Sequence, residues 1–144
     1  MNAFTKTLAI TSGLIKREIN YYRIRPTNLL LFLTYRCTSR CNTCTMWQRK
    51  TQEKELSLDQ WKSFIDSLAA SYKIKNVEMF GGDALLRKEV LLSLTQYIRK
   101  KTHAEVDLVT NCNLMDADTA SALVDSGINV IAVSLDGVGP AHDK

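Results

Sequence analysis

Apolar positions change their spacing several times along the chain, and each change marks a predicted element. Residues 29–33 form an unbroken apolar run, which is typical of a strand buried on both faces. A polar, cysteine-rich loop follows from Thr34 to about Lys54. Ser57 then opens a predicted helix, because Gln60 lies three residues on and completes a capping box. The apolar face of that helix comprises Trp61, Phe64, Ile65 and Leu68.

The alternation of strand and helix continues after this helix. Further strands are predicted at residues 77–80, 106–109 and 129–133, and further helices at residues 86–98 and 116–125. Basic residues end the first of these helices, and a glycine stops the second. Strict alternation of this kind predicts an α/β fold with a parallel sheet of about four strands.

Residues 1–28 precede this series and are predicted to form an amphipathic helical extension. The helix is expected over residues 4–22, with apolar positions near one face at Phe4, Leu8, Ile15, Ile19 and Tyr22. The same segment is strongly basic. It is either a solvated helix packed beside the core or a basic surface for anionic lipid or an acidic partner.

Composition narrows the class of protein. The chain has 144 residues, of which 45% are hydrophobic and 24% charged, and this excludes a disordered tail or a disulfide-dense secreted module. A net charge of +4 is too weak to indicate nucleic-acid binding. No apolar run has the roughly 18 residues of a membrane span, and the N-terminus lacks a signal-peptide pattern. We therefore predict a cytoplasmic protein with reduced thiols.

Three of the four cysteines lie together, spaced Cys37-x3-Cys41-x2-Cys44. In a reducing compartment this density favours a metal or a cluster over a disulfide. Structural zinc takes four ligands, and no histidine lies nearby to complete the set. A [4Fe–4S] cluster also usually takes four thiolates, so three would leave one iron open to a small molecule.

Every predicted strand is followed by an unusual loop. The cysteine loop follows the first strand, and Gly81, Gly82 and Asp83 follow the second. Residues 110–113 leave the third strand, and residues 134–137 leave the fourth. The carboxyl ends of parallel strands share one edge, where such folds bind ligands. The four loops are therefore expected to converge on one rim.

This combination of motifs resembles the radical S-adenosylmethionine (SAM) enzymes over residues 29–144. The resemblance implies a partial TIM-like barrel in which Cys37, Cys41 and Cys44 hold a [4Fe–4S] cluster. SAM would chelate the open iron, and its reductive cleavage would give a 5′-deoxyadenosyl radical that abstracts hydrogen from a substrate. No catalytic residue beyond the cluster ligands is implied.

The resemblance also assigns the SAM contacts, which are Gly81, Gly82, Asp83, Asn111, Ser134 and Asp136. Gly81 and Gly82 lack a Cβ, so their backbone can approach the methionyl ammonium closely. Asn111, Ser134 and Asp136 can hydrogen-bond ribose hydroxyls. Taken singly, the glycines could form a plain turn and the polar residues a helix cap.

Several positions depart from the family pattern or lie outside it. The turn after the second strand has Asp83 where the family has glutamate, and Thr43 stands where an aromatic residue often lies near adenine. Met46 or Trp47 could replace that apolar surface.

Cys112 is either a half-buried small residue, a substrate-handling thiol or a ligand to a second centre. His103 is expected to be solvated, and the stretch around His142 hints at a peptide-modifying branch.

Basic residues surround the cysteine loop. They offset thiolate charge, and we predict that they dock an acidic electron donor such as a flavodoxin or ferredoxin. These residues are Arg36, Arg40, Arg49 and Lys50.

Residues 29–144 hold fewer β/α units than the family's core, so we predict a core domain truncated at its C-terminus. The substrate stays unidentified, and a peptide is the candidate. Two other functions remain open: a non-catalytic zinc module, with Cys112 as a fourth ligand, and an inactive fragment of a longer enzyme.

Overall fold

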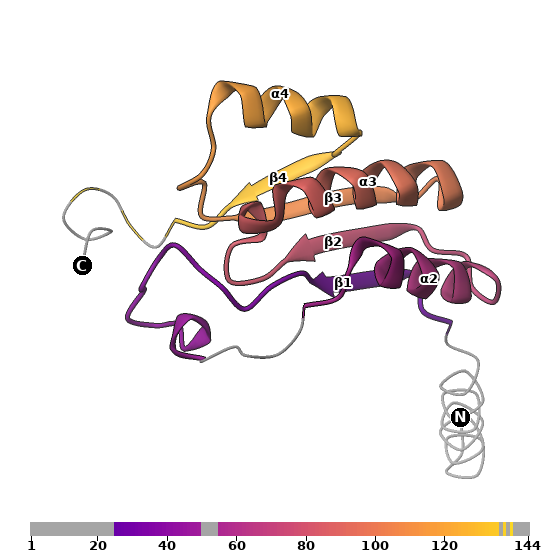
Figure 1. Cartoon of the computed structure of the whole chain (residues 1–144), viewed down its shortest axis with the longest axis horizontal. Coiled ribbons are helices and arrows are strands. Elements are labelled where there is room, and N and C mark those ends of the chain that lie inside the picture. The colour runs from indigo at the N-terminus through magenta and orange to yellow at the C-terminus, as the bar shows by residue number, and fades with distance from the viewer. Residues whose placement is uncertain (1–24, 50–54, 136, 138, 140–144) are drawn as a thin grey trace, which may run out of the picture.

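Four parallel strands form one sheet in chain order, and every helix between them packs on the same face of it. The computed structural model describes residues 25–49, 55–135, 137 and 139 (Figure 1). The strands are β1 (Asn28–Phe32), β2 (Asn76–Phe80), β3 (Glu105–Thr110) and β4 (Val130–Val133). The predicted helix over residues 4–22 lies outside the described residues.

The register of the sheet aligns one buried row across the strands. Leu31 pairs with Met79, Met79 with Leu108, and Leu108 with Ile131. The first three of these are buried, and Ile131 is partly buried against the same core. The helices α2 (Leu58–Ala69), α3 (Lys88–Thr102) and α4 (Ala117–Ser126) cover this row. Their buried contributions are Trp61, Ile65, Leu91, Leu94, Ile98 and Leu123. The predicted parallel α/β fold is confirmed.

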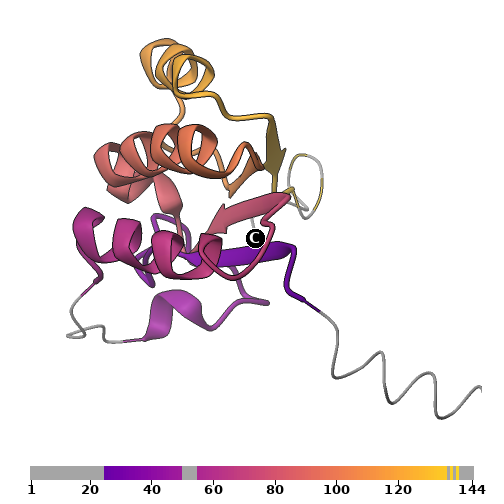
Figure 2. The same ribbon diagram turned by 90° about the vertical axis from the view of Figure 1, so that its right-hand side faces the viewer.

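The other face of the sheet is open in the described parts of the chain. Figure 2 shows the helices on one side of the strands. Leu30 is consequently 67% exposed and Val130 55% exposed. The prediction that the first strand is buried on both faces was therefore wrong for this structure, because helices cover only one of them.

Local capping fixes where the helices begin. At α2, the Ser57 side chain accepts a hydrogen bond from the Gln60 backbone at 3.2 Å, and the Gln60 side chain accepts one from the Ser57 backbone at 2.8 Å. The predicted capping box is confirmed. Phe64, however, is 42% exposed and packs edge-on against Trp61 at the margin of the core.

The helix predicted from residue 86 begins later. A short 3-10 helix, η2 (Ala84–Arg87), precedes α3, because the Asp83 side chain caps the backbone N–H of Leu85 at 3.2 Å. This cap places the buried carboxylate of Asp83 directly beneath the rim.

Candidate functional site

The loops that follow the strands do converge on one rim, and backbone hydrogen bonds hold them together. Beyond β1, the Gly82 N–H donates to the Thr34 carbonyl and the Asp83 N–H to the Arg36 carbonyl, both at 2.8 Å. On the other side, the Ser134 N–H donates to the Thr110 carbonyl at 3.1 Å. The cysteine loop therefore starts as an extension of the sheet, alongside the turn after β2.

The glycine pair is required by this close packing. A Cβ on Gly81 would lie 2.5 Å from the Thr34 carbonyl oxygen, and one on Gly82 would lie 2.3 Å from that of Arg36. Both distances are shorter than any real van der Waals contact. The structure thus gives Gly81 and Gly82 a packing role, and their predicted contact with a ligand stays a prediction.

Cys37 lies at the point where three of the loops meet. Its half-buried thiol donates to the Gly82 carbonyl at 3.3 Å. Its sulfur accepts from the Ser39 backbone N–H at 3.4 Å and from the Asn111 side-chain amide at 3.8 Å. The first cysteine is therefore fixed by contacts from the exits of β2 and β3.

Cys41 and Cys44 are arranged by a local turn instead. The Cys44 N–H donates to the Cys41 carbonyl at 3.2 Å, and the Met46 N–H, at the start of the 3-10 helix η1 (Met46–Gln48), reaches the Cys44 sulfur at 3.5 Å. Trp47 donates its indole N–H to the Cys41 carbonyl at 3.2 Å. All four cysteines are free thiols, and no three His, Cys, Asp or Glu side chains converge as a metal site in the described parts of the chain.

A cluster of polar side chains, which we call the polar latch, joins the cysteine loop to the ends of β2 and β3. Its members are Thr38, Ser39, Asp83, Asn111 and Asn113. Asp83, 1% exposed, accepts from the Thr38 hydroxyl at 3.0 Å. The Asn111 amide donates to Ser39 at 2.8 Å and to Thr38 at 3.2 Å. The Asn113 amide donates to the same hydroxyls at 2.9 and 3.4 Å.

A second cluster, which we call the loop clamp, ties the start of the cysteine loop to its end. Glu55 accepts from Arg36 at 2.9 and 3.0 Å, from Arg87 at 3.3 Å, and from the Thr34 hydroxyl. Arg87 also donates to the backbone carbonyls of Leu33 and Leu56, at 3.0 and 2.7 Å. The two ends of the loop therefore share one set of ionic contacts.

Hydrogen bonds and neighbouring charges together keep Glu55 ionised in the loop clamp. Burial acts to raise its pKa, but the hydrogen bonds from Arg36 and Thr34 and the charges of Arg36 and Arg87 outweigh burial. The pKa of Glu55 consequently lies below its usual value. The carboxylate stays ionised at neutral pH and keeps both arginines in place.

The remaining predicted site residues are only partly placed. Ser134 is exposed at the exit of β4, and Asp136 lies outside the described residues. Asn111 directs its amide nitrogen at the cysteine loop, and its predicted contact with ribose stays a prediction. Cys112 is half-buried and holds the left-handed conformation, with φ 62°. His103 is exposed on the opposite rim, as predicted.

Several residues of this site were missed by sequence reasoning. Thr38, Ser39 and Asn113 carry no motif of their own, although the repeated Asn-x-Asn after the third strand could have drawn notice. Glu55 and Arg87 lie far apart in sequence, and only the folded chain brings them together.

Basic residues of the loop lie against aromatic rings. The Arg40 guanidinium lies 5.4 Å from the Trp47 ring centroid, and that of Arg49 lies 5.1 Å from the Tyr35 ring centroid. Arg36 is engaged in the loop clamp, while Lys50 and His142 lie outside the described residues.

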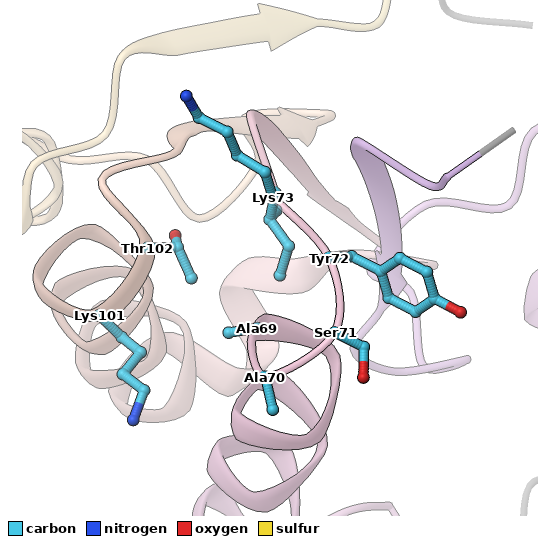
Figure 3. A pocket seen from close by; sticks show the side chains of 8 residues that line it. Ala69, Ala70, Ser71, Tyr72, Lys73, Lys101 and Thr102 are labelled. Atoms are coloured by element: carbon cyan, nitrogen blue, oxygen red, sulfur yellow. The ribbon is translucent and has the colours of Figure 1, made fainter. Parts of the chain in front are cut away.

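A hollow of about 380 Å³ lies away from the rim, where α2 and α3 end (Figure 3). Among the side chains that border it are Tyr72, Lys73, Lys101 and Thr102. It contains no cysteine and none of the predicted site residues, so it does not belong to the candidate site.

None of the helices in the described ranges combines the length and the apolar character needed to cross a membrane.

Comparison with known proteins identifies the family of the chain. The family model of the Radical SAM superfamily matches residues 31–144. The chain is 34% identical over 113 residues to Fe-coproporphyrin III synthase of Methanosarcina barkeri, covering 78% of this chain and 28% of that protein. It is 30% identical over 115 residues to PqqA peptide cyclase of Rhodopseudomonas palustris, covering 78% and 29% respectively. The chain thus spans less than a third of either relative.

Solved structures share the architecture at low sequence identity. BtrN in complex with AdoMet and 2-DOIA superimposes with a TM-score of 0.65 at 19% identity, over 81% of this chain and 48% of BtrN. Streptococcus suis SuiB bound to the precursor peptide SuiA gives 0.63 at 16% identity, over 92% and 30%. These likenesses confirm β/α units of a partial TIM-like barrel. With the family model over most of its length, the chain belongs to the Radical SAM superfamily.

Proposed function

We propose that the chain binds a [4Fe–4S] cluster through Cys37, Cys41 and Cys44, with SAM beside it, as part of a radical SAM enzyme. The observation that carries this proposal is the position of the three cysteines in a member of the family. They leave β1 on the same rim as the glycine turn and the polar exits of β3 and β4. When bound, the cluster and SAM supply the electron and the radical that abstracts hydrogen from the substrate.

The donor set fits an iron–sulfur cluster. Three thiols lie within one loop, and no fourth cysteine lies in that loop. Backbone N–H groups reach the sulfurs of Cys37 and Cys44, at 3.4 and 3.5 Å. In a bound cluster, the same N–H groups would donate to the ligating sulfurs. The exposed Cys41 is open to an incoming cluster.

The glycine turn and the strand exits are proposed to hold SAM. Because the Gly82 carbonyl contacts the Cys37 sulfur at 3.3 Å, a ligand bound next to this cysteine is within reach of the turn. Both oxygens of Asp83 are engaged by the chain itself, at Thr38, Thr110 and Leu85. Asp83 therefore acts by fixing the turn. Ser134, Asp136 and the Asn111 carbonyl oxygen, which can accept a second hydrogen bond, are proposed to meet the ribose.

The surroundings of the loop suit an acidic reductant in a cytoplasmic setting. Arg40 and Arg49 lie along the exposed side of the loop, and we assign them to docking a flavodoxin or ferredoxin. The names of two similar proteins, PqqA peptide cyclase and SuiB bound to SuiA, support a peptide as the candidate substrate. The substrate-binding part of the enzyme is proposed to lie in segments that its longer relatives contain beyond the matched region.

Anaerobic reconstitution with iron and sulfide tests the proposal. We expect about four irons per chain and visible absorbance typical of an iron–sulfur cluster. With a strong reductant and SAM, 5′-deoxyadenosine should form. Cys37→Ser, Cys41→Ser and Cys44→Ser should each lower the iron content sharply, whereas Cys112→Ser should not.

Two outcomes would overturn the proposal. A single colourless zinc per chain that depends on Cys112 would show a binding module. Iron content that is unaffected by all three cysteine substitutions would show that the loop is not the ligand set. A cluster without 5′-deoxyadenosine would instead limit the chain to cofactor binding, as expected of an inactive fragment.

A further inference from the structure

Two asparagines of the polar latch approach the cysteine loop from the same turn, but only one reaches a cysteine. Asn111 and Asn113 both donate their side-chain amides to the hydroxyls of Thr38 and Ser39. The Asn111 amide nitrogen also lies 3.8 Å from the Cys37 sulfur, within hydrogen-bond distance for sulfur. The pair therefore differs in one contact to a cluster ligand.

The side-chain amide of Asn111 is held in this orientation through its carbonyl oxygen. Its carbonyl oxygen accepts the backbone N–H of Asn113 at 3.1 Å, which directs the amide nitrogen at the loop. Below it, the Thr110 hydroxyl accepts the backbone N–H of Cys112 at 3.1 Å and donates to Asp83 at 3.3 Å. The Asn111 side chain is therefore anchored to the end of β3.

An N–H group directed at a ligating sulfur changes the electronic properties of a cluster. Hydrogen bonds to the sulfurs stabilise negative charge there, and the reduced cluster carries one more negative charge than the oxidised one. Such a donor therefore raises the reduction potential. The two N–H bonds of Asn111 serve three acceptors, at Ser39, Thr38 and Cys37, so one of them is shared.

We propose that, in the cluster-bound form proposed above, Asn111 is a positioning residue that acts through Cys37 and makes the cluster easier to reduce. Its amide holds the Cys37-Thr38-Ser39 segment against the end of β3 and donates to the ligating sulfur. Asn113 holds the same segment without touching a ligand. Asn111 thus couples the end of β3 to the electron-transfer step.

The test is a redox titration of the reconstituted full chain, followed by electron paramagnetic resonance. Asn111→Ala is compared with Asn113→Ala, which removes hydrogen bonds to the same two hydroxyls and serves as the matched control. At the potential where half of the wild-type cluster is reduced, Asn111→Ala should show a reduced-to-oxidised ratio about fivefold lower, the effect of one hydrogen bond of ordinary strength. Asn113→Ala should stay close to the wild-type ratio. Equal potentials in the two variants, at equal iron content, would overturn the proposal.

A second pair keeps the proposal testable if alanine disturbs loading of the cluster. Asn111→Asp and Asn113→Asp add the same charge, and each retains a side-chain oxygen in place of the amide. The reduced fraction should fall further in Asn111→Asp than in Asn113→Asp, and equal reduced fractions would again overturn the proposal. If the wild-type chain holds no cluster at all, the proposed function fails. A wild-type cluster whose potential is insensitive to position 111 contradicts only the role of Asn111.

Discussion

The first and last cysteines of the loop are held by different kinds of contact. Both sulfurs accept a backbone N–H from two residues on, that of Ser39 at Cys37 and that of Met46 at Cys44. Cys37 is fixed in addition by tertiary contacts with Gly82 and Asn111. The exits of β2 and β3 therefore hold Cys37, and a local turn holds Cys44. Changes in the body of the fold should accordingly be felt at Cys37 before they are felt at Cys44.

The largest effect is expected from Gly82→Ala. The added Cβ would lie 2.3 Å from the Arg36 carbonyl oxygen and 2.7 Å from that of Tyr35, so the start of the loop must move. We expect the free energy of unfolding to fall by about 3 kcal/mol, as measured by chemical denaturation. The rate at which an alkylating reagent labels Cys37 should rise, while that of Cys44 stays unchanged.

Gly139→Ala is the matched control for this substitution. Apart from its chain neighbours, no atom of the described residues lies within 4 Å of a Cβ at Gly139, although its φ of +57° is unfavourable for alanine. Its cost should be about 1 kcal/mol, without an effect on either cysteine. Equal labelling of Cys37 and Cys44 in Gly82→Ala would contradict the contrast between the two ligands.

Asp83→Ala should have the next largest effect. It leaves the hydroxyls of Thr38 and Thr110 and the backbone N–H of Leu85 without their acceptor. Loss of these hydrogen bonds is expected to cost about 2 kcal/mol. Asp83→Asn keeps one carbonyl oxygen and should cost less. Amide hydrogen exchange should accelerate at residues 38–39 and not at residues 44–46, and uniform acceleration would argue against a latch that acts on Cys37 alone.

The sheet and its helix caps could be predicted because local sequence determines them. The strands deviate from their predicted bounds by one residue at most, and both partners of the capping box lie within four residues of chain. The start of α3 could not be predicted in the same way. It depends on the Asp83 side chain, whose geometry at Leu85 favours a 3-10 turn over an immediate α-helix.

Within the candidate site, only the residues that belong to a sequence motif could be predicted. Spacing identified Cys37, Cys41 and Cys44, and strand order placed the loops on one rim. The polar latch and the loop clamp join residues as far apart as Thr38 and Asn111, or Arg36 and Glu55. Such pairings are set by the three-dimensional fold, and no periodicity along the chain records them.

Acid should release the loop clamp. The pKa of Glu55 in the folded chain lies below its usual value of 4.5, so its contribution to stability is present above that pH. It is lost as pH falls from about 4.5 through the lowered folded pKa. Because the side chain is 27% exposed, we expect a contribution of about 1 kcal/mol.

Unfolding of the apo-protein between pH 7 and pH 3, compared with Glu55→Gln, measures this contribution. Asp66 and Asp116, whose pKa values are also lowered by hydrogen bonds, occur in both proteins and cancel in the comparison. Wild type should lose its advantage over Glu55→Gln on acidification. An advantage that persists at pH 3 would show that the ionised Glu55 does not stabilise the loop.

The smallest effect is expected at Cys112, which lies outside the proposed set of cluster ligands. Its φ of 62° is costly for a residue with a Cβ and readily adopted by glycine. Cys112→Gly should raise the free energy of unfolding by about 0.5 kcal/mol, since the greater freedom of glycine in the unfolded chain offsets part of the gain. Cys112→Ala, which removes the thiol and keeps the strain, should bring no gain.

His103→Gly is the matched control on the opposite rim, because His103 has a φ of 58° at the end of α3. His103→Gly should raise the free energy of unfolding by a similar amount, although no cysteine is changed. If Cys112→Gly stabilises the chain and leaves the iron content intact, backbone conformation alone explains the left-handed turn. The polar latch then carries the connection between β3 and Cys37 without help from the fourth thiol. Loss of metal in both Cys112→Gly and Cys112→Ala would instead place Cys112 in the ligand set.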